Sequence, residues 1–265
     1  MALTKKQQEA REGKITASQV GVLMSGDPLK VLNLWKLHIG DPSYEEPDLS
    51  GVWPVRLGEA TEALNLAWYD MKHGKIGRMG EVVDGPEPWM CCTLDAWDRT
   101  LGIPVEAKHV GGREPLETII ARYTPQTTWQ MLVTGTKQCA LSVIMGANEP
   151  VVEFLTLDDA YAAELMRRAR NFMACVESLT PPVELPPVAA PVAAVKEYDM
   201  TTAPGWGVQA AVWIQTSGAV ETAKKAEREL KAMVPADAKI ASGCRITITR
   251  NRAGALSLRE SKICR

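Results

Sequence analysis

The sequence contains no apolar run long enough to cross a membrane, and its first residues do not predict a leader segment. A membrane helix needs about 20 consecutive apolar residues, and no stretch of the 265-residue chain approaches that length. The first residues, MALTKKQQEAREGK, are charged, whereas a signal peptide has an apolar centre. We therefore expect a soluble, cytoplasmic protein without a membrane partner.

The cysteines and charges also lack the patterns of common cofactor and nucleic-acid proteins. The six cysteines have no paired CxxC spacing, which argues against a zinc or iron–sulfur site and favours reduced thiols in the core. The net charge is -2, so the chain has no overall positive field for a polyanion. A nucleic acid would have to bind a local basic patch.

What is present is enough apolar surface for a globular core, and one clear break in composition. With 46% hydrophobic and 23% charged residues, the chain suits one large domain or two unequal ones. Proline and alanine dominate LTPPVELPPVAAPVAAV, residues 179–195. Repeated proline fixes φ and removes hydrogen-bond donors, so this segment predicts an extended linker. We expect a domain at 1–180, a linker at 181–196 and an appendage at 197–265.

The hydrophobic periodicity predicts a mixed central sheet flanked by helices. Apolar residues at helical spacing predict helices, and short apolar runs between turn residues predict strands. The expected helices cover residues 16–24, 31–40, 55–74, 124–135 and 158–179, and the expected strands cover 75–84, 88–98, 103–110, 138–146 and 151–157. In the appendage we expect a helix at 216–234 and a hairpin at 244–260. The fold class is therefore α/β (α+β).

Two acids and a lysine lie in strands whose other residues are mostly apolar. Asp95 ends one strand of the expected hairpin, and Glu106 and Lys108 share one face of the other because side chains alternate along a strand. Adjacent carboxylates repel unless a cation intervenes, and Mg²⁺ prefers such oxygens together with the backbone carbonyl of Ala107. With Lys108 orienting or deprotonating a water, this set suits phosphodiester hydrolysis. The alternative is that Asp95 and Asp98 are turn residues beside a solvated strand face.

Further motifs, in order along the chain, favour the catalytic interpretation. Glu62 in LGEATEAL lies where the long helix turns an acid toward the sheet. Gln126 and Gln130 are one helical turn apart on the helix after the lysine strand. Arg11 and Ser18 bound REGKITAS, a basic segment with hydroxyl groups before a helix. Together with TLDA, VEAK and YTPQTTWQMLVTG, these segments resemble the lambda-type or YqaJ-like viral recombinase exonucleases of the PD-(D/E)xK superfamily.

The resemblance implies a restriction-endonuclease-like fold and a role for each matching residue. The implied Mg²⁺ ligands, with Mn²⁺ as the expected substitute, are Asp95, Glu106, Glu62 and the carbonyl of Ala107. Lys108 would assist the attacking water, and Gln126 would lie beside the metal site. The implied ligands of a DNA 5′-phosphate are Arg11, Ser18 and Thr93.

The resemblance covers about residues 8–178 and departs from the family pattern at two positions. Ala96 stands where a glycine is common after the strand-end aspartate. Thr128 replaces the second glutamine of the usual QxQ, which leaves the role of Gln130 open. His109, on the opposite strand face from the lysine, also has no assigned role.

The implied function is a Mg²⁺-dependent deoxyribonuclease that degrades double-stranded DNA ends in the 5′→3′ direction. It would leave 3′ single strands for phage-type recombination by strand annealing. The resemblance further implies an annealing recombinase partner, a homo-oligomer in the form of a trimeric ring, and a phage or prophage origin in a bacterial host. Two alternatives stay open: an endonuclease of the same fold, and a catalytically inactive DNA-end-binding protein.

Overall fold

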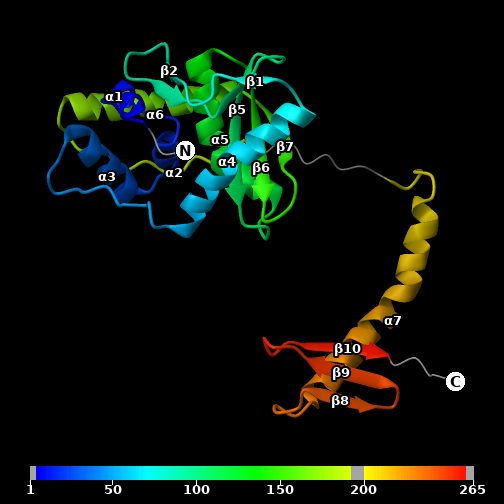
Figure 1. Ribbon diagram of the computed structural model, residues 1–265. Coiled ribbons are helices and arrows are strands. Elements are labelled where there is room, and N and C mark those ends of the chain that lie inside the picture. Colours follow the sequence, from blue (N-terminus) through cyan, green and yellow to red (C-terminus); the bar gives the residue numbers. More distant parts are fainter. Residues whose placement is uncertain (1–3, 192–199, 261–265) are drawn as a thin grey trace. The chain divides into compact units, whose positions relative to one another are not determined.

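The chain divides into two compact units, each with helices and strands of its own. Figure 1 shows the computed structural model, which describes residues 4–191 and 200–260. The first unit spans Met1–Ala194, and the second spans Val195–Arg265. Every helix within the described residues is too short or too polar to span a bilayer.

The first unit is built on a five-stranded mixed sheet with the strand order β1-β4-β5-β6-β7. Its strands are β1 (Ile76–Gly77), β4 (Ala96–Asp98), β5 (Ile103–Val110), β6 (Gln138–Met145) and β7 (Val151–Thr156). A separate ribbon pairs β2 (Val82–Asp84) with β3 (Cys91–Thr93). The helices are α1 (Lys5–Arg11), α2 (Val20–Ser25), α3 (Pro28–Ile39), α4 (Trp53–Lys72), α5 (Leu116–Thr134) and α6 (Asp159–Glu177). β5 and β6 are parallel and the other neighbours antiparallel, which confirms the predicted fold class.

Helices α4 and α5 cover opposite faces of the sheet. Because side chains alternate along a strand, successive residues of β5 pack against one helix or the other. Val105 of β5 packs with Leu66 of α4, whereas Val110 of β5 packs with Ile119 of α5. Glu106 has the same parity as Val110 and therefore faces α5. The chain passes through α5 between β5 and β6, since two parallel strands need such a crossover.

The N-terminal helices and α6 pack around the largest apolar cluster of the unit. This cluster joins Val20 of α2, Trp35 of α3, Trp129 of α5 and Leu165 of α6. Burying an aliphatic side chain such as Val20 or Leu165 stabilises a fold by about 1.5–3 kcal/mol. Trp129 also donates its indole N–H to the carbonyl of Cys91 at 2.9 Å. The cluster therefore fixes α2, β3 and α5 relative to one another.

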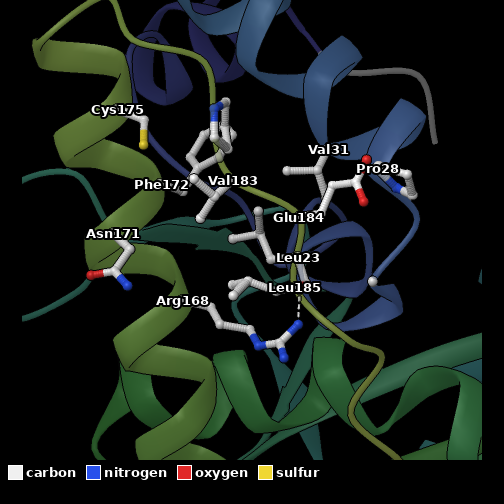
Figure 2. Close-up of a pocket in the computed structure, with 12 residues that line it drawn as sticks. Leu23, Pro28, Val31, Arg168, Asn171, Phe172, Cys175, Val183, Glu184 and Leu185 are labelled. Atoms are coloured by element: carbon white, nitrogen blue, oxygen red, sulfur yellow. Dashed lines mark hydrogen bonds between the residues drawn. The ribbon is translucent and has the colours of Figure 1, made fainter.

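Residues 182–188 form an extended strap along α2, α3 and α6, and Figure 2 shows the cavity between the strap and these helices. Arg168 of α6 is 4% exposed, and its guanidinium donates to the carbonyls of Pro186 at 2.7 Å and Leu23 at 2.9 Å. The cavity has a volume of about 70 Å³. The predicted linker 181–196 therefore begins as a segment bound to the first unit.

Gly26, which ends α2, makes room for the strap. Its φ is +66°, and a Cβ built there would lie 2.4 Å from the backbone nitrogen of Pro187. A glycine is needed because it has no Cβ and adopts positive φ without strain. The N–H of Val188 then donates to the carbonyl of Met24 at 2.9 Å. The end of α2 and the strap therefore hold each other in place.

The second unit consists of α7 (Trp206–Ala232) and a sheet of β8 (Ile240–Gly243), β9 (Ile246–Arg250) and β10 (Leu256–Glu260). β9 and β10 form the predicted hairpin, and β8 adds a strand that the sequence pattern does not indicate. Ile248, 4% exposed, is the one buried residue among those described in this unit. The unit therefore has a very small core of its own.

Two predicted strands are each divided between sheets. The segment 75–84 forms β1 and β2, and the segment 88–98 forms β3 and β4. Between the divided halves, the N–H of Gly80 donates to the carbonyl of Leu94 at 2.9 Å. The apolar alternation does not reveal this change of partner, because both halves keep the same period of two.

Two helices begin more than one turn earlier than predicted. α5 begins at Leu116 rather than at residue 124, and α7 begins at Trp206 rather than at residue 216. Proline favours the first turn of a helix, so Pro125 indicates a start. In the structure Pro125 lies inside α5, although a proline there removes one helical N–H. Tertiary packing of α5 outweighs this local preference.

Candidate active site

Asp95 lies at the break between β3 and β4, on the open edge of β5. Its Oδ2 accepts the N–H of Ala107 at 2.9 Å. The pairing of β4 with β5 ends at Val105, so the backbone of β5 beyond this point faces the Asp95 carboxylate instead of a strand. The N–H and C=O of one strand residue point to the same side, so the carbonyl of Ala107 also faces the Asp95 side.

Glu106 is 0% exposed, and three polar side chains bind its carboxylate. Lys108 forms an ion pair with Oε1, Gln126 donates its amide to the same oxygen, and Gln130 donates to Oε2. Taking a carboxylate out of water is costly unless such partners compensate. The two glutamines lie one turn apart on α5, so the helix directs both to one carboxylate. The structure thereby gives Gln130 a contact that the sequence alone does not assign.

Burial and neighbouring charges shift the pKa values at this site. Burial and then the negative charge of Glu106 raise the pKa of Asp95 to about 8. Burial opposes the charge on Lys108, but the carboxylates of Glu106 and Asp95 outweigh it and raise the pKa of the lysine. The ammonium also lies 5.2 Å from the centre of the Tyr123 ring. A lysine held protonated in this way orients a water but is a poor base for deprotonating it.

Asn65 attaches α4 to the two central strands. It is 1% exposed and donates to the carbonyls of Lys108 at 3.2 Å and Ser142 at 2.9 Å. Its own oxygen accepts the Ser142 hydroxyl at 2.6 Å. Glu62 lies one helical turn before Asn65 and lines the same cleft as Asp95. The sequence analysis does not identify Asn65. The one feature that could have indicated it is that an asparagine lies on the apolar side of a helix.

Arg11, Ser18 and Thr93 line the main cleft, which has a volume of about 650 Å³. Arg11 donates to the hydroxyl of Thr93 at 3.4 Å, and the hydroxyl of Ser18 lies 3.2 Å from that of Thr16. Guanidinium and hydroxyl groups are suitable donors for phosphate oxygens. The lining includes all predicted site side chains, namely Arg11, Ser18, Glu62, Thr93, Asp95, Glu106, Lys108 and Gln126.

The donor set of the main cleft fits a divalent cation. Asp95 and Glu106 supply carboxylates, and the carbonyl of Ala107 supplies a further oxygen. A cation beside them would offset the burial and like charge that raise the pKa of Asp95. Within residues 4–191 and 200–260, no three acidic, histidine or cysteine side chains cluster as a metal site. Mg²⁺ usually takes one or two carboxylates and several waters, so Asp95, Glu106 and one carbonyl are chemically suitable ligands.

Asp98 and His109 have contacts that stabilise the fold. Asp98 is 0% exposed and accepts the hydroxyl of Tyr69 at 2.8 Å and the N–H of Thr100 at 2.7 Å. Nε2 of His109 donates to the carbonyl of Gly146 at 2.9 Å. The turn role proposed in the alternative interpretation therefore applies to Asp98.

Comparison with known proteins identifies a family for part of the first unit and supports its fold. A family model of the YqaJ-like viral recombinase domain matches residues 6–137. The alkaline exonuclease LHK-Exo from Laribacter hongkongensis is 19% identical with a TM-score of 0.52, and the match covers 66% of this chain and 94% of that chain. A phage-related exonuclease from Haemophilus somnus is 10% identical with a TM-score of 0.51, covering 63% and 94%. These likenesses confirm the predicted restriction-endonuclease-like fold. No curated protein matches the chain.

Proposed function

Because residues 6–137 belong to the YqaJ-like viral recombinase domain family, we propose that this protein is a Mg²⁺-dependent exonuclease that digests double-stranded DNA ends. The main cleft is the observation that carries this proposal. Two carboxylates, a lysine and a set of phosphate donors line one space there. Structures of the same fold include an alkaline exonuclease and a phage-related exonuclease.

The residues of the main cleft have distinct parts in the proposed hydrolysis. When bound, Mg²⁺ stabilises charge on the phosphate and on the leaving oxygen. Its proposed ligands are Asp95, Glu106, Glu62 and the carbonyl of Ala107. Lys108, kept protonated by its carboxylate neighbours, orients the attacking water. Gln126 and Gln130 fix the rotation of the Glu106 carboxylate.

The phosphate donors of α1, of the turn before α2 and of β3 support the proposed preference for a DNA end. Arg11, Ser18 and Thr93 would bind the 5′-phosphate of the terminal nucleotide. Because these donors line the same cleft as the carboxylates, the next phosphate along the strand would lie at the metal. Digestion would then proceed in the 5′→3′ direction.

We further propose the biological setting implied by the family. The exposed 3′ single strands would serve a strand-annealing recombinase in the cytoplasm of a bacterial host of a phage or prophage. Mn²⁺ would replace Mg²⁺, and three copies would form a ring. Light scattering would test the ring, since the trimer would have three times the mass of the 28.9 kDa chain.

Digestion of linear duplexes labelled at either end tests the activity. Each duplex is prepared with and without a 5′-phosphate and incubated in Mg²⁺ or in EDTA. We expect mononucleotide release from phosphorylated 5′ ends in Mg²⁺ and none in EDTA. Digestion unaffected by EDTA would contradict the metal mechanism, release from 3′ ends would contradict the direction, and linearisation of a plasmid would indicate an endonuclease.

Asp95→Ala is the variant that separates catalysis from DNA binding. It removes a buried carboxylate of the metal site, so the rate should fall by about 10³-fold or more while DNA binding persists. Asp159→Ala is the control, because Asp159 is an exposed carboxylate paired with Lys137 at 3.1 Å. Equal digestion by Asp95→Ala and the unaltered protein would contradict the proposed role of Asp95. DNA binding by both forms without digestion by either would favour a binding protein.

A further inference from the structure

A second cleft joins the main cleft at the candidate catalytic residues. It has a volume of about 330 Å³ and shares Glu62, Asp95 and Lys108 with the main cleft. Part of its remaining wall consists of Pro54, Val55 and Gly58 of α4 and Tyr123 of α5. The second cleft is therefore an additional space beside the proposed metal site.

The two clefts overlap near Glu62 of α4, where Ala63 lines only the main cleft and Asn65 only the second, and they extend toward opposite ends of the helix. Gly58 lines only the second cleft, Asp70 lines only the main cleft, and Glu62 lies between them and lines both. An α-helix rises about 1.5 Å per residue, so Gly58 and Asp70 are about 18 Å apart along the axis. One strand of a DNA duplex advances about 3.4 Å per nucleotide along its axis. Together the clefts are therefore longer than a single nucleotide.

Strand β5 and helix α5 also contribute different residues to the two clefts. On β5, Glu106 lines only the main cleft and His109 only the second. On α5, Gln126 lines only the main cleft and Tyr123 only the second. The two clefts therefore adjoin one another along all three elements, and they share Glu62, Asp95 and Lys108.

We propose that the second cleft binds the nucleotide on the 3′ side of the scissile phosphate, which is the first nucleotide of the retained strand. This inference rests on the proposed exonuclease function. The main cleft contains the phosphate donors Arg11, Ser18 and Thr93, whereas the described lining of the second cleft contains none of them. The terminal nucleotide therefore occupies the main cleft, and the retained strand leaves through the second.

The reaction itself requires two spaces, one on each side of the scissile phosphate. The oxygen of water forms a bond to phosphorus, and the bond from phosphorus to the 3′-oxygen of the terminal nucleotide breaks. One proton of the water ends on that 3′-oxygen, which gives a mononucleotide with a 3′-hydroxyl. The new 5′-phosphate stays on the retained strand. The leaving nucleoside and the retained nucleoside thus need separate positions.

The wall of the second cleft suits a sugar and a base. Pro54, Val55 and Gly58 present apolar or backbone surface, and the Tyr123 ring offers a face for stacking. After each cut, the new 5′-phosphate at Lys108 has to move to the donors of the main cleft. The strand would therefore advance along α4 from its N-terminal half toward its C-terminal half.

Gly58→Leu tests this assignment by filling the second cleft. A Cβ at Gly58 meets no atom within 4 Å, and leucine favours a helix more than glycine does. Ala60→Leu is the matched control, because Ala60 is an exposed residue of α4 that lines neither cleft. Both are made in the full chain, and their folding is compared by circular dichroism.

Two small substrates distinguish the retained side from the terminal side. One is the 5′-phosphorylated thymidine dinucleotide, and the other is 5′-phosphothymidine 3′-(methyl phosphate), in which a methyl group replaces the retained nucleoside. Release of 5′-dTMP is measured by chromatography. Gly58→Leu should lower kcat/KM for the dinucleotide by about tenfold or more, since small displacements of reacting groups have large effects on rate. Hydrolysis of the methyl ester should be unchanged.

An equal loss on both substrates, a loss on the methyl ester alone, or no loss on either would overturn the assignment. Val55→Trp obstructs the same wall from a residue that is 37% exposed, and it should show the same selectivity if Gly58→Leu does not fold. If the unaltered protein releases no dTMP from any substrate in Mg²⁺, the exonuclease proposal fails, and this inference fails with it.

Discussion

The two longest helices within the described residues, α4 and α7, differ in what they bury. α4 has 20 residues and buries Asn65, Leu66 and Tyr69 against the sheet. α7 has 27 residues, and none of those described is buried, while Trp206 and Trp213 are 54% and 72% exposed. Isolated helices gain little stability without tertiary packing. Helix length therefore does not identify the helix that positions the candidate catalytic residues. In α4 the buried, hydrogen-bonded Asn65 is the more informative feature.

Among the variants that compare these helices, Asn65→Leu should have the largest effect, because it removes the polar attachment of α4 while keeping a side chain of similar size. We expect the rate of DNA digestion to fall by about 10–100-fold, as is typical when a group that orients metal ligands is lost. Initial rates at several Mg²⁺ concentrations would measure this. An equivalent polar change on the exposed surface of α7 should leave the rate unchanged.

Tyr69→Phe is the control on α4, since it removes a buried hydrogen bond to Asp98 away from the proposed metal ligands. It should lower the melting temperature while the rate constant per folded molecule persists. If Tyr69→Phe slows digestion as much as Asn65→Leu, the effect comes from general destabilisation of α4. Combining Asn65→Leu with Glu62→Gln should give little further loss if Asn65 acts by positioning Glu62.

Ile248→Ala tests how far the second unit depends on its small core. Loss of a buried isoleucine side chain costs about 2–5 kcal/mol in a packed core, and the lower end applies where few neighbours surround it. Hydrogen exchange in β9 should accelerate, while exchange in β5 and the digestion rate stay constant. A parallel loss of digestion would show that the units depend on each other.

Gly26→Ala and Gly40→Ala separate a close contact from a backbone preference. Both glycines end helices with φ +66°, but only at Gly26 does a Cβ meet another segment, at 2.4 Å from Pro187. Both variants lose the freedom of glycine at positive φ. Gly26→Ala should lower the free energy of unfolding by about 1–3 kcal/mol more than Gly40→Ala does, as overpacking typically does. Urea denaturation would measure the difference, and equal losses would mean that the strap is not bound in solution.

His38→Leu should have the smallest effect. It tests whether one buried polar atom without a hydrogen-bond partner makes the stability of the first unit depend on pH. Among the described residues, Nε2 of His38 is buried without a hydrogen-bond partner, and burial lowers the pKa of this histidine. The unfolded chain therefore binds the proton more readily, so stability falls as the pH drops through about 6.5. The variant should lose that pH dependence, by about 1 kcal/mol or less between pH 7 and pH 5. An unchanged slope would assign it to other groups.

The sequence is sufficient for the mixed sheet and for the pairing of side chains within one element, because both depend on local signals. The grouping of Arg11, Ser18, Thr93 and Glu62 with Asp95 is implied by the family resemblance. Alternation places Glu106 and Lys108 on one face, and helical spacing places Gln126 and Gln130 together. It is not sufficient for Asn65, whose partner Ser142 is 77 residues away. Long-range contacts of this kind leave no local period.

The composition of the strap is also informative only in part. Proline and alanine predict extended backbone at 179–195, and the structure has no regular element at 182–188. Whether such a segment binds the domain depends on a complementary surface. That surface includes Arg168 of α6 and Gly26, and Gly26 is far from the strap in sequence.

The strap also has a consequence for the order of events on the ribosome. Every predicted side chain of the main cleft lies before residue 127, but α2 acquires its contacts with Pro187 and Val188 only when the chain has been synthesised through that point. Domains fold largely in the order of synthesis. A nascent chain would therefore carry all of its chemical groups before the segment that secures α2, and cleavage ahead of the strap would return it to that immature state.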